Sequence, residues 1–303
     1  MNLPPLVKAW YQAARPRSLT ATYSPLLLGA AITLVNGVFN LPRFLLALFG
    51  ALMLQIGANL VNEYVDFKRG TDKNKVDGMG MVLSHGGLTA PQVLIGAVAT
   101  ITLGALIGLF FVAITGTTLL WVGIIGVIVV ITYTAGPLPL SYIGLGELSV
   151  FIAMGPLMVF GTYLAVSGGI IEWRAAAAGI ALGFPIAEIL HANNMRDLES
   201  DKLANKHTLA VRFGLKGARK EYVILMYGAY VTVALLILLG YAPWTALLVL
   251  ITLPEAYKLI QAATSTDDPK ILSRVQGMTA QFNFRFGLTM AAGWLLFLLV
   301  RRL

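Results

Sequence analysis

Long apolar stretches alternate with short polar segments along nearly the whole chain. Nine stretches are distinguishable, near residues 18–36, 41–61, 91–113, 117–135, 147–167, 173–192, 222–240, 243–262 and 283–300. Most reach about 20 residues, the length that an α-helix needs to cross the hydrocarbon core of a bilayer. The pattern therefore predicts an all-α integral membrane protein with about nine transmembrane helices. The pair 222–240 and 243–262 is predicted to form a helical hairpin with a tight turn at residues 240–243.

The composition agrees with a membrane protein. Hydrophobic residues make up 57% of the 303 residues and charged residues 12%, with a mean hydropathy of +0.78, whereas an average soluble domain is about 25% charged. No shift in composition divides the chain, so we expect one domain over residues 1–303. The segment 1–17, with Trp10 and Tyr11, is predicted to lie at the membrane interface. Cysteine is absent, which excludes disulfides and thiol chemistry.

The positive charges predict how the chain is oriented. The formal net charge is +8, and most of the 22 Lys and Arg residues lie before the first span, in the polar loops 62–90 and 193–220, or just before the last span. Basic residues concentrate on the cytoplasmic side of membrane proteins. We therefore expect the N-terminus and both polar loops in the cytoplasm and the C-terminus outside. This distribution also argues against a nucleic-acid partner.

Two acidic runs, residues 62–72 and 193–201, stand out from the apolar background. The chain has only 14 Asp and Glu residues, and these runs contain Glu63, Asp66, Asp72, Asp197, Glu199 and Asp201. Each run also places an Asn four residues before an Asp, at Asn62/Asp66 and at Asn193/Asp197. The repeat suggests two related halves that face one site. Carboxylates this rare beside membrane spans indicate a chemical role.

Helical spacing brings the polar groups of each run together. In an unbroken helix Asn193, Asp197 and Asp201 share one face, because they are four residues apart. In the first run we expect Gly70 to end the helix, so that the chain can turn Asp72 back toward the other acids.

Converging carboxylates require a cation. Two unit charges about 4 Å apart repel by about 4 kcal/mol at an effective dielectric near 20. Mg²⁺ suits such a site, because it prefers hard oxygen ligands and shares its coordination between one or two carboxylates and a substrate phosphate. We predict Asp66, Asp72, Asp197 and Asp201 as metal ligands, with Asn62 and Asn193 supporting the metal or a diphosphate. The alternative is that these are solvated loop carboxylates paired with neighbouring Lys and Arg residues.

Two other kinds of titratable residue give weaker signals. His85, His191 and His207 are scattered without an i, i+4 pair, which argues against a zinc site, and we interpret His191 as a helix-end histidine, with a position in the pocket as the alternative. Glu188 lies within a span, where we expect a hydrogen bond to another helix or a position in a pocket.

The two acidic runs resemble the aspartate-rich motifs of the UbiA-type intramembrane prenyltransferases, although Glu63 occupies a position that is often Asp there. Residues 206–214 (KHTLAVRFG) and 15–19 (RPRSL) are similar to the stretch after the second motif and to the entry into the first span. Residues 133–147 (YTAGPLPLSYIGLGE) resemble the branch that prenylates 1,4-dihydroxy-2-naphthoate. The branches acting on 4-hydroxybenzoate and haem carry a Lys-Arg pair in this loop, which this chain lacks.

The resemblance implies helices around a central cavity that opens to the cytoplasmic side and laterally to membrane lipid. It implies Mg²⁺-dependent transfer of a polyprenyl group from polyprenyl diphosphate to an aromatic acid, 1,4-dihydroxy-2-naphthoate, with decarboxylation, giving demethylmenaquinone at the cytoplasmic membrane. We assign substrate binding to Arg15, Lys68, Lys75, Tyr133, Tyr142, Arg196, Lys206 and Arg212.

Two alternatives remain open from the sequence. The acceptor of a prenyltransferase can be another ring, such as a phylloquinone or tocopherol precursor. A secondary transporter also carries intramembrane carboxylates, but near the middle of its spans, whereas these acids follow the cytoplasmic ends of spans.

Overall fold

The structure of this protein is a computed structural model that describes residues 4–70, 81–134 and 139–301. Within these ranges the chain forms helices, turns and loops, without a strand. The helices are α1 (Pro5–Ala14), α2 (Thr20–Val35), α3 (Leu41–Arg69), α4 (Ala90–Thr115), α5 (Thr117–Thr134), α6 (Gly146–Ile152), α7 (Met158–Ser167), α8 (Trp173–Arg196), α9 (Leu198–Leu203), α10 (Leu209–Leu238), α11 (Leu253–Thr264) and α12 (Pro269–Val300). A 3₁₀ turn (Pro16–Leu19) precedes α2, a π-helical turn (Ala153–Leu157) joins α6 to α7, and a 3₁₀ helix, η4 (Trp244–Thr252), precedes α11.

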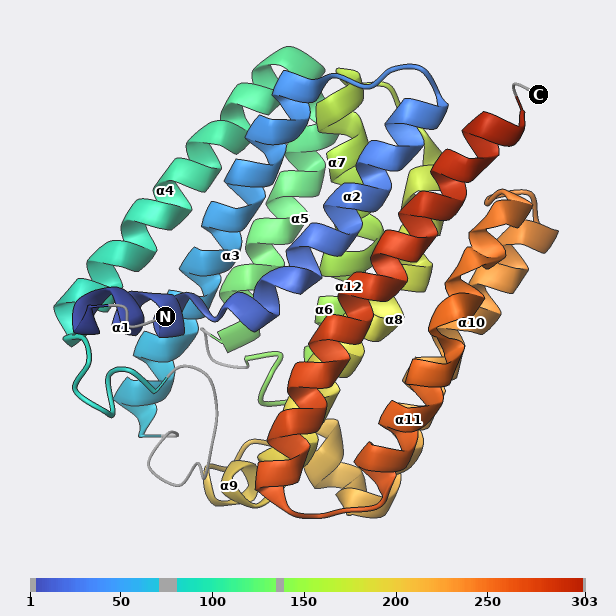
Figure 1. The fold of residues 1–303 in the computed structure, drawn as a ribbon. Coiled ribbons are helices and arrows are strands. Elements are labelled where there is room, and N and C mark those ends of the chain that lie inside the picture. The colour runs from blue at the N-terminus through green and yellow to red at the C-terminus, as the bar shows by residue number, and fades with distance from the viewer. Residues whose placement is uncertain (1–3, 71–80, 135–138, 302–303) are drawn as a thin grey trace.

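Each predicted apolar stretch overlaps one of these helical segments, so the predicted fold class is confirmed. Eight segments are long and apolar enough to cross a membrane, with α6 and α7 forming one of them. The one predicted span outside these eight, residues 117–135, corresponds to α5, whose apolar part (Thr117–Val130) is shorter. The protein is a multi-pass integral membrane protein in which the long helices run side by side (Figure 1).

Local sequence signals set where several helices begin and end. Thr89 and Gln92 form a capping box at the start of α4. Gly70 has φ 70° and ends α3, as predicted. Gly240, with φ 75°, lies in the predicted hairpin turn after α10. The second arm of the hairpin begins as the 3₁₀ helix η4 and becomes α-helical only near Pro254, whose missing N–H cannot complete the α-helical ladder before it.

Small residues allow the central helices to approach closely. A Cβ atom at Gly155 would lie 2.7 Å from the Gly183 Cα and 2.7 Å from the Gly179 carbonyl oxygen. The turn between α6 and α7 therefore packs directly on α8, as expected for small residues at membrane helix contacts. Helix α8 also packs on α10 and α12, which places the second acidic run at one end of the core of the bundle.

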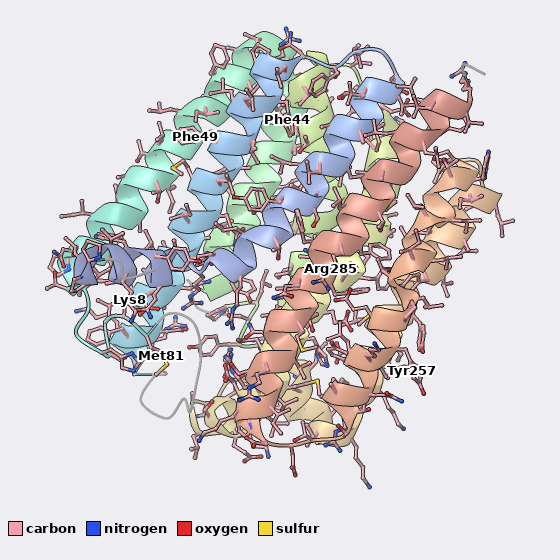
Figure 2. All side chains as sticks on the ribbon, in the orientation of Figure 1. Lys8, Phe44, Phe49, Met81, Tyr257 and Arg285 are labelled. Atoms are coloured by element: carbon pink, nitrogen blue, oxygen red, sulfur yellow. The ribbon has the colours of Figure 1, made fainter. Side chains whose placement is uncertain are left out.

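The outer surface of the bundle is apolar. Phe49 on α3 and Tyr257 on α11 point away from the bundle (Figure 2) and are 46% and 56% exposed. Helix α1 lies across the ends of α3 and α4 (Figure 1), with Ala9 and Ala13 buried in a small apolar cluster that includes Leu60. The interfacial position of the segment 1–17 stays a prediction.

Candidate active site

The second acidic run does not form one unbroken helix. Helix α8 ends at Arg196, Asp197 has φ −92° and ψ 11°, and α9 begins at Leu198. The prediction of a continuous helical face for Asn193, Asp197 and Asp201 is therefore wrong. Asp favours such a junction, because its short polar side chain competes with the helical backbone. The Asp201 N–H still donates to the Asp197 carbonyl oxygen over 2.7 Å, so the interruption is small.

Arg196 holds two of the predicted site residues in a fixed frame. Its guanidinium donates to both carboxylate oxygens of Asp197 over 2.7 Å and to the Asn193 side-chain oxygen over 2.6 Å. A fourth bond, over 2.9 Å, joins Arg196 to Gln276 on α12. Arg196 is itself buried, so these bonds are shielded from water and strong. Gln276, far away in the chain, was not predicted, and no sequence signal marks it.

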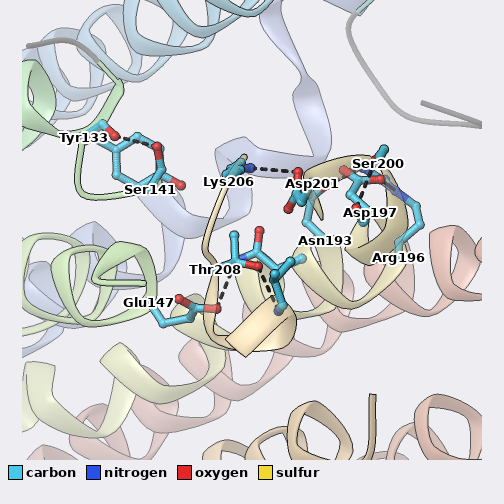
Figure 3. Close-up of polar contacts among 12 residues, drawn as sticks. Tyr133, Ser141, Glu147, Asn193, Arg196, Asp197, Ser200, Asp201, Lys206 and Thr208 are labelled. Atoms are coloured by element: carbon cyan, nitrogen blue, oxygen red, sulfur yellow. Dashed lines mark hydrogen bonds and ion pairs between the residues drawn. The ribbon is translucent and has the colours of Figure 1, made fainter. Parts of the chain in front are cut away.

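Asp201 lies next to a second cation, pointing toward Lys206 rather than toward Arg196 (Figure 3). The Lys206 ammonium group is 3.3 Å from an Asp201 carboxylate oxygen, and Asp201 is fully buried. The carboxylates of Asp197 and Asp201 are thus partly neutralised by different cations, one on each side of α9.

Tyr142 connects the two acidic runs. Its ring has the Arg69 guanidinium, from the end of α3, 4.9 Å from its centroid and the Lys206 ammonium group at 5.9 Å. Tyr133 lies close enough to Asp66 and to Asp201 for both carboxylates to interact electrostatically with its hydroxyl group. The structure therefore brings the end of α3 and the α8–α9 junction to one site, as the repeated motif predicts.

Glu63 in the first run anchors the backbone. Its carboxylate, fully buried, accepts hydrogen bonds from the Met81 and Leu83 N–H groups over 2.9 and 3.2 Å, and from Arg15 over 3.2 Å. Arg15, predicted to bind substrate, thus lies against a structural carboxylate.

The other predicted residues of the first run lie either on the last turns of α3 or outside the described residues. Asn62 and Asp66 lie on the last turns of α3, and Lys68 is 5.8 Å from the centroid of the Tyr64 ring. Asp72, predicted as a metal ligand, and Lys75, predicted to bind substrate, lie outside the described residues.

Arg212 fixes the loop that carries Tyr142. It donates to the Ile143 carbonyl oxygen over 2.8 Å and to the His207 carbonyl oxygen over 3.2 Å. The His207 N–H in turn donates to the Tyr142 carbonyl oxygen over 2.8 Å. The Arg212 guanidinium therefore joins the segment of Ile143 to the segment of His207. Binding of a diphosphate by Arg212 stays a prediction.

Glu188 differs from its expected role. It is fully buried within α8, and neither carboxylate oxygen has a hydrogen-bond partner in the part of the chain that the structure describes. The predicted hydrogen bond to another helix is therefore not made there.

A cleft of about 350 Å³ adjoins the second acidic run on the side of α9 that faces α10 and α12. It is lined by Met195, Arg196, Asp197, Leu198, Glu199, Ser200, Leu203, Leu215, Asp267 and Pro269. Asp197 therefore lines the cleft while its carboxylate is paired with Arg196.

The described donors fit a magnesium diphosphate site. Asp66, Asp197 and Asp201 offer hard carboxylate oxygens, which Mg²⁺ prefers. Each carboxylate has about four lone-pair positions, so the two bonds from Arg196 leave acceptor capacity on Asp197. Lys206 places a positive charge at the same site, where it can offset a leaving phosphate group.

Comparison with known proteins identifies the class of this one. The sequence pattern of the UbiA prenyltransferase family matches residues 22–299. The chain belongs to this family, and it is a transferase of prenyl groups.

Two relatives and one solved structure narrow the comparison. The chain is 32% identical to the 1,4-dihydroxy-2-naphthoate octaprenyltransferase of Bacillus subtilis, over 94% of this chain and 92% of the relative. It is 38% identical to the protein of the same name from Mycobacterium tuberculosis, over 78% and 79% of the two chains. The fold is similar to that of a UbiA homolog from Archaeoglobus fulgidus bound to DMAPP and Mg²⁺, with a TM-score of 0.66, 16% identity and coverage of 93% and 99%.

Proposed function

We propose that this protein transfers a polyprenyl group from polyprenyl diphosphate to 1,4-dihydroxy-2-naphthoate in a Mg²⁺-dependent reaction. The observation that carries the proposal is the convergence of the two acidic runs around Tyr133 and Tyr142. Two relatives named for this acceptor support the naphthoate assignment. The product is the reduced form of demethylmenaquinone, after loss of the acceptor's carboxylate as CO₂.

The carboxylates and cations of the site have separate roles in this reaction. Bound Mg²⁺ would neutralise the negative charge that develops on the leaving diphosphate. Asp66, Asp197 and Asp201, with Asp72, hold the metal, and Asn62 and Asn193 support it. Lys206 and Lys68 face the diphosphate, with Lys75 as a further donor. Arg196 keeps Asn193 and Asp197 oriented before substrate arrives, so that less ordering is needed in the transition state.

The aromatic residues act on the prenyl group. As the bond between its first carbon and the diphosphate oxygen breaks, the electron pair leaves with the diphosphate and positive charge develops on the allylic carbons. The ring face of Tyr133 attracts such a charge, whereas the Tyr142 ring already faces the Arg69 and Lys206 cations. The ring carbon that bears the carboxylate of the acceptor then forms the new bond, and decarboxylation returns the electrons to the ring.

The loop from Tyr133 to Glu147 favours a naphthoate acceptor. It carries no Lys or Arg, and within the described part Tyr142 is held by His207 and Ile143 by Arg212. A naphthoate ring has more apolar surface than a benzoate ring, and each Å² removed from water contributes roughly 25 cal/mol. We expect the carboxylate of the acceptor to bind a Lys or Arg of the two polar loops.

The distribution of basic residues supports a cytoplasmic site. We infer that the protein lies in the cytoplasmic membrane with both acidic runs facing the cytoplasm and the prenyl tail extending between helices into lipid. The acceptor is water-soluble and the donor is lipid-soluble, so a site at the membrane surface lets both reach it.

One assay tests the proposal. Purified protein in lipid vesicles is given Mg²⁺, a polyprenyl diphosphate and either 1,4-dihydroxy-2-naphthoate or 4-hydroxybenzoate, and the products are identified by mass. We expect a prenylated, decarboxylated naphthalenediol and little prenylated benzoate. Equal efficiency with the two acceptors would reject the naphthoate assignment, and turnover in the presence of a chelator would reject the metal mechanism.

A further inference from the structure

A second cluster of titratable residues lies beside the candidate active site. Glu147 at the start of α6, His191 on α8 and Glu221 on α10 place their ligand atoms within 4.8 Å of one another. The His191 Nδ1 atom is 3.3 Å from a Glu147 carboxylate oxygen and 3.6 Å from a Glu221 carboxylate oxygen. His191 is fully buried and Glu147 nearly so. Three helices thus contribute one group each to a site that is buried at His191 and Glu147 and 20% exposed at Glu221.

The other ring nitrogen of His191 fixes what Nδ1 can do. Nε2 is 2.7 Å from the Ala218 carbonyl oxygen, which can only accept a hydrogen bond, so Nε2 carries a hydrogen atom. In a neutral imidazole Nδ1 then presents a lone pair toward two carboxylates. That arrangement is repulsive unless a cation, either a proton or a metal ion, lies between them.

The distances favour a metal ion over a proton. A charged N–H to carboxylate bond is about 2.7–2.9 Å long, and one hydrogen atom points at one acceptor. Contacts of 3.3 and 3.6 Å are longer than that. The 3.3 Å contact matches the separation of roughly 3.3–3.4 Å between neighbouring ligands around a tetrahedral ion with bonds of about 2.0–2.1 Å, and the 3.6 Å contact is slightly longer. A divalent ion also balances both carboxylates, whereas an imidazolium leaves one charge uncompensated.

Orphaned oxygens at the same place give an independent indication of a ligand. Asn194 donates from its side-chain nitrogen to a Glu147 carboxylate oxygen over 2.9 Å, which places its amide group at the cluster. Its Oδ1 atom and the second Glu147 carboxylate oxygen, Oε2, are buried without a hydrogen-bond partner among the described residues. Asn194 is only 3% exposed. Buried polar atoms of this kind call for a partner.

We propose that Glu147, His191 and Glu221 bind a divalent transition-metal ion, with Zn²⁺ the best match to one imidazole nitrogen and carboxylate oxygens. The hydrogen bond from Nε2 to the Ala218 carbonyl oxygen is the support that metal-binding histidines ordinarily have. The site is separate from the aspartates that face the diphosphate. Its ion cross-links α6, α8 and α10 directly behind the loop that carries Tyr142.

Metal binding to the purified, full-length protein tests the proposal without any turnover. Every protein carries Asp201→Asn to weaken the diphosphate site and is stripped with a chelator, then given excess Mg²⁺ and an equivalent of Zn²⁺ or Co²⁺. We expect about one Zn²⁺ per chain by elemental mass spectrometry, and intense visible absorption bands from four-coordinate Co²⁺. An octahedral Co²⁺ spectrum, or no retained metal, overturns the proposal.

Two variants and a control assign the ligands. His191→Ala removes the nitrogen ligand, and Glu221→Gln is the milder change because that side chain is 20% exposed. Both should lower Zn²⁺ retention at least tenfold, while Glu199→Gln, an exposed surface carboxylate, should not. Retention unchanged in Glu221→Gln would overturn the assignment even where His191→Ala fails to fold. Because no prenyl transfer is measured, failure here leaves the proposed enzyme function standing.

Discussion

Replacing Glu63 with Gln should destabilise the protein and slow prenyl transfer. The Glu63 carboxylate is fully buried and accepts bonds from Arg15 and from the Met81 and Leu83 N–H groups. A Gln side chain has the same shape but only one acceptor oxygen. When that oxygen serves Met81 and Arg15, the amide nitrogen faces the Leu83 N–H, and two donors oppose each other.

The magnitude follows from these contacts. A buried N–H left without a partner costs about 1–3 kcal/mol, and the loss of charge from the two remaining bonds weakens each by about 1 kcal/mol. Arg15 is 23% exposed, so water recovers part of its loss. We expect a total of about 2–4 kcal/mol, and a fall in melting temperature on the order of 5 °C.

Thermal unfolding in one detergent, followed by circular dichroism, measures this change, and a Mg²⁺ titration of prenyl transfer accompanies it. Glu199→Gln is the control, because Glu199 forms an exposed ion pair with Lys202 that contributes about 0–1 kcal/mol. Glu63→Asp distinguishes a carboxylate that positions the backbone from one that acts on the metal. It keeps the charge but is too short to reach both N–H groups, so a carboxylate that positions the backbone should lose stability in this variant as well.

Two outcomes would refute this reasoning. If Glu63→Gln melts at the wild-type temperature, the three contacts do not hold the protein as described. If Glu63→Asp has full stability and activity while Glu63→Gln needs far more Mg²⁺, Glu63 acts on the metal rather than on the backbone.

Three further predictions concern the site, the topology and the packing. Asp201→Ala should lower prenyl transfer by roughly 10³-fold, about 4 kcal/mol, with unchanged helical content; near-normal turnover would remove Asp201 from the site. A cysteine at Glu172 should react with an impermeant thiol reagent from outside intact cells, and one at Lys216 should not; the reverse labelling would overturn the topology. Gly179→Leu should destabilise the protein by at least about 1–3 kcal/mol, because its Cβ would lie 2.6 Å from a backbone atom. Gly108→Leu, with open space around it, should melt normally; equal melting of both variants would contradict the packing.

The helices and the chemical class of the site could be predicted from the order of residues in the chain. A helix must cover the thickness of the bilayer, so the lengths of the apolar stretches predict the spans found from α2 to α12. Gly70 was predicted to end α3 because glycine adopts a positive φ without strain, and it does so. The acidic runs were recognisable because carboxylates are rare in this chain and costly near a membrane.

Which side chains meet depends on how the separate helices pack. Sequence spacing describes neighbours on one helix, but the packing of separate helices sets the contacts between distant residues. For this reason the bond of Glu63 to Arg15 and the bonds of Arg212 to backbone carbonyl oxygens were not predicted. The scattered histidines argued against a zinc site in the sequence, whereas the fold brings His191 to Glu147 and Glu221 from two other helices. A cluster built from three helices leaves no periodic pattern in the chain, because its members come together only when the helices pack.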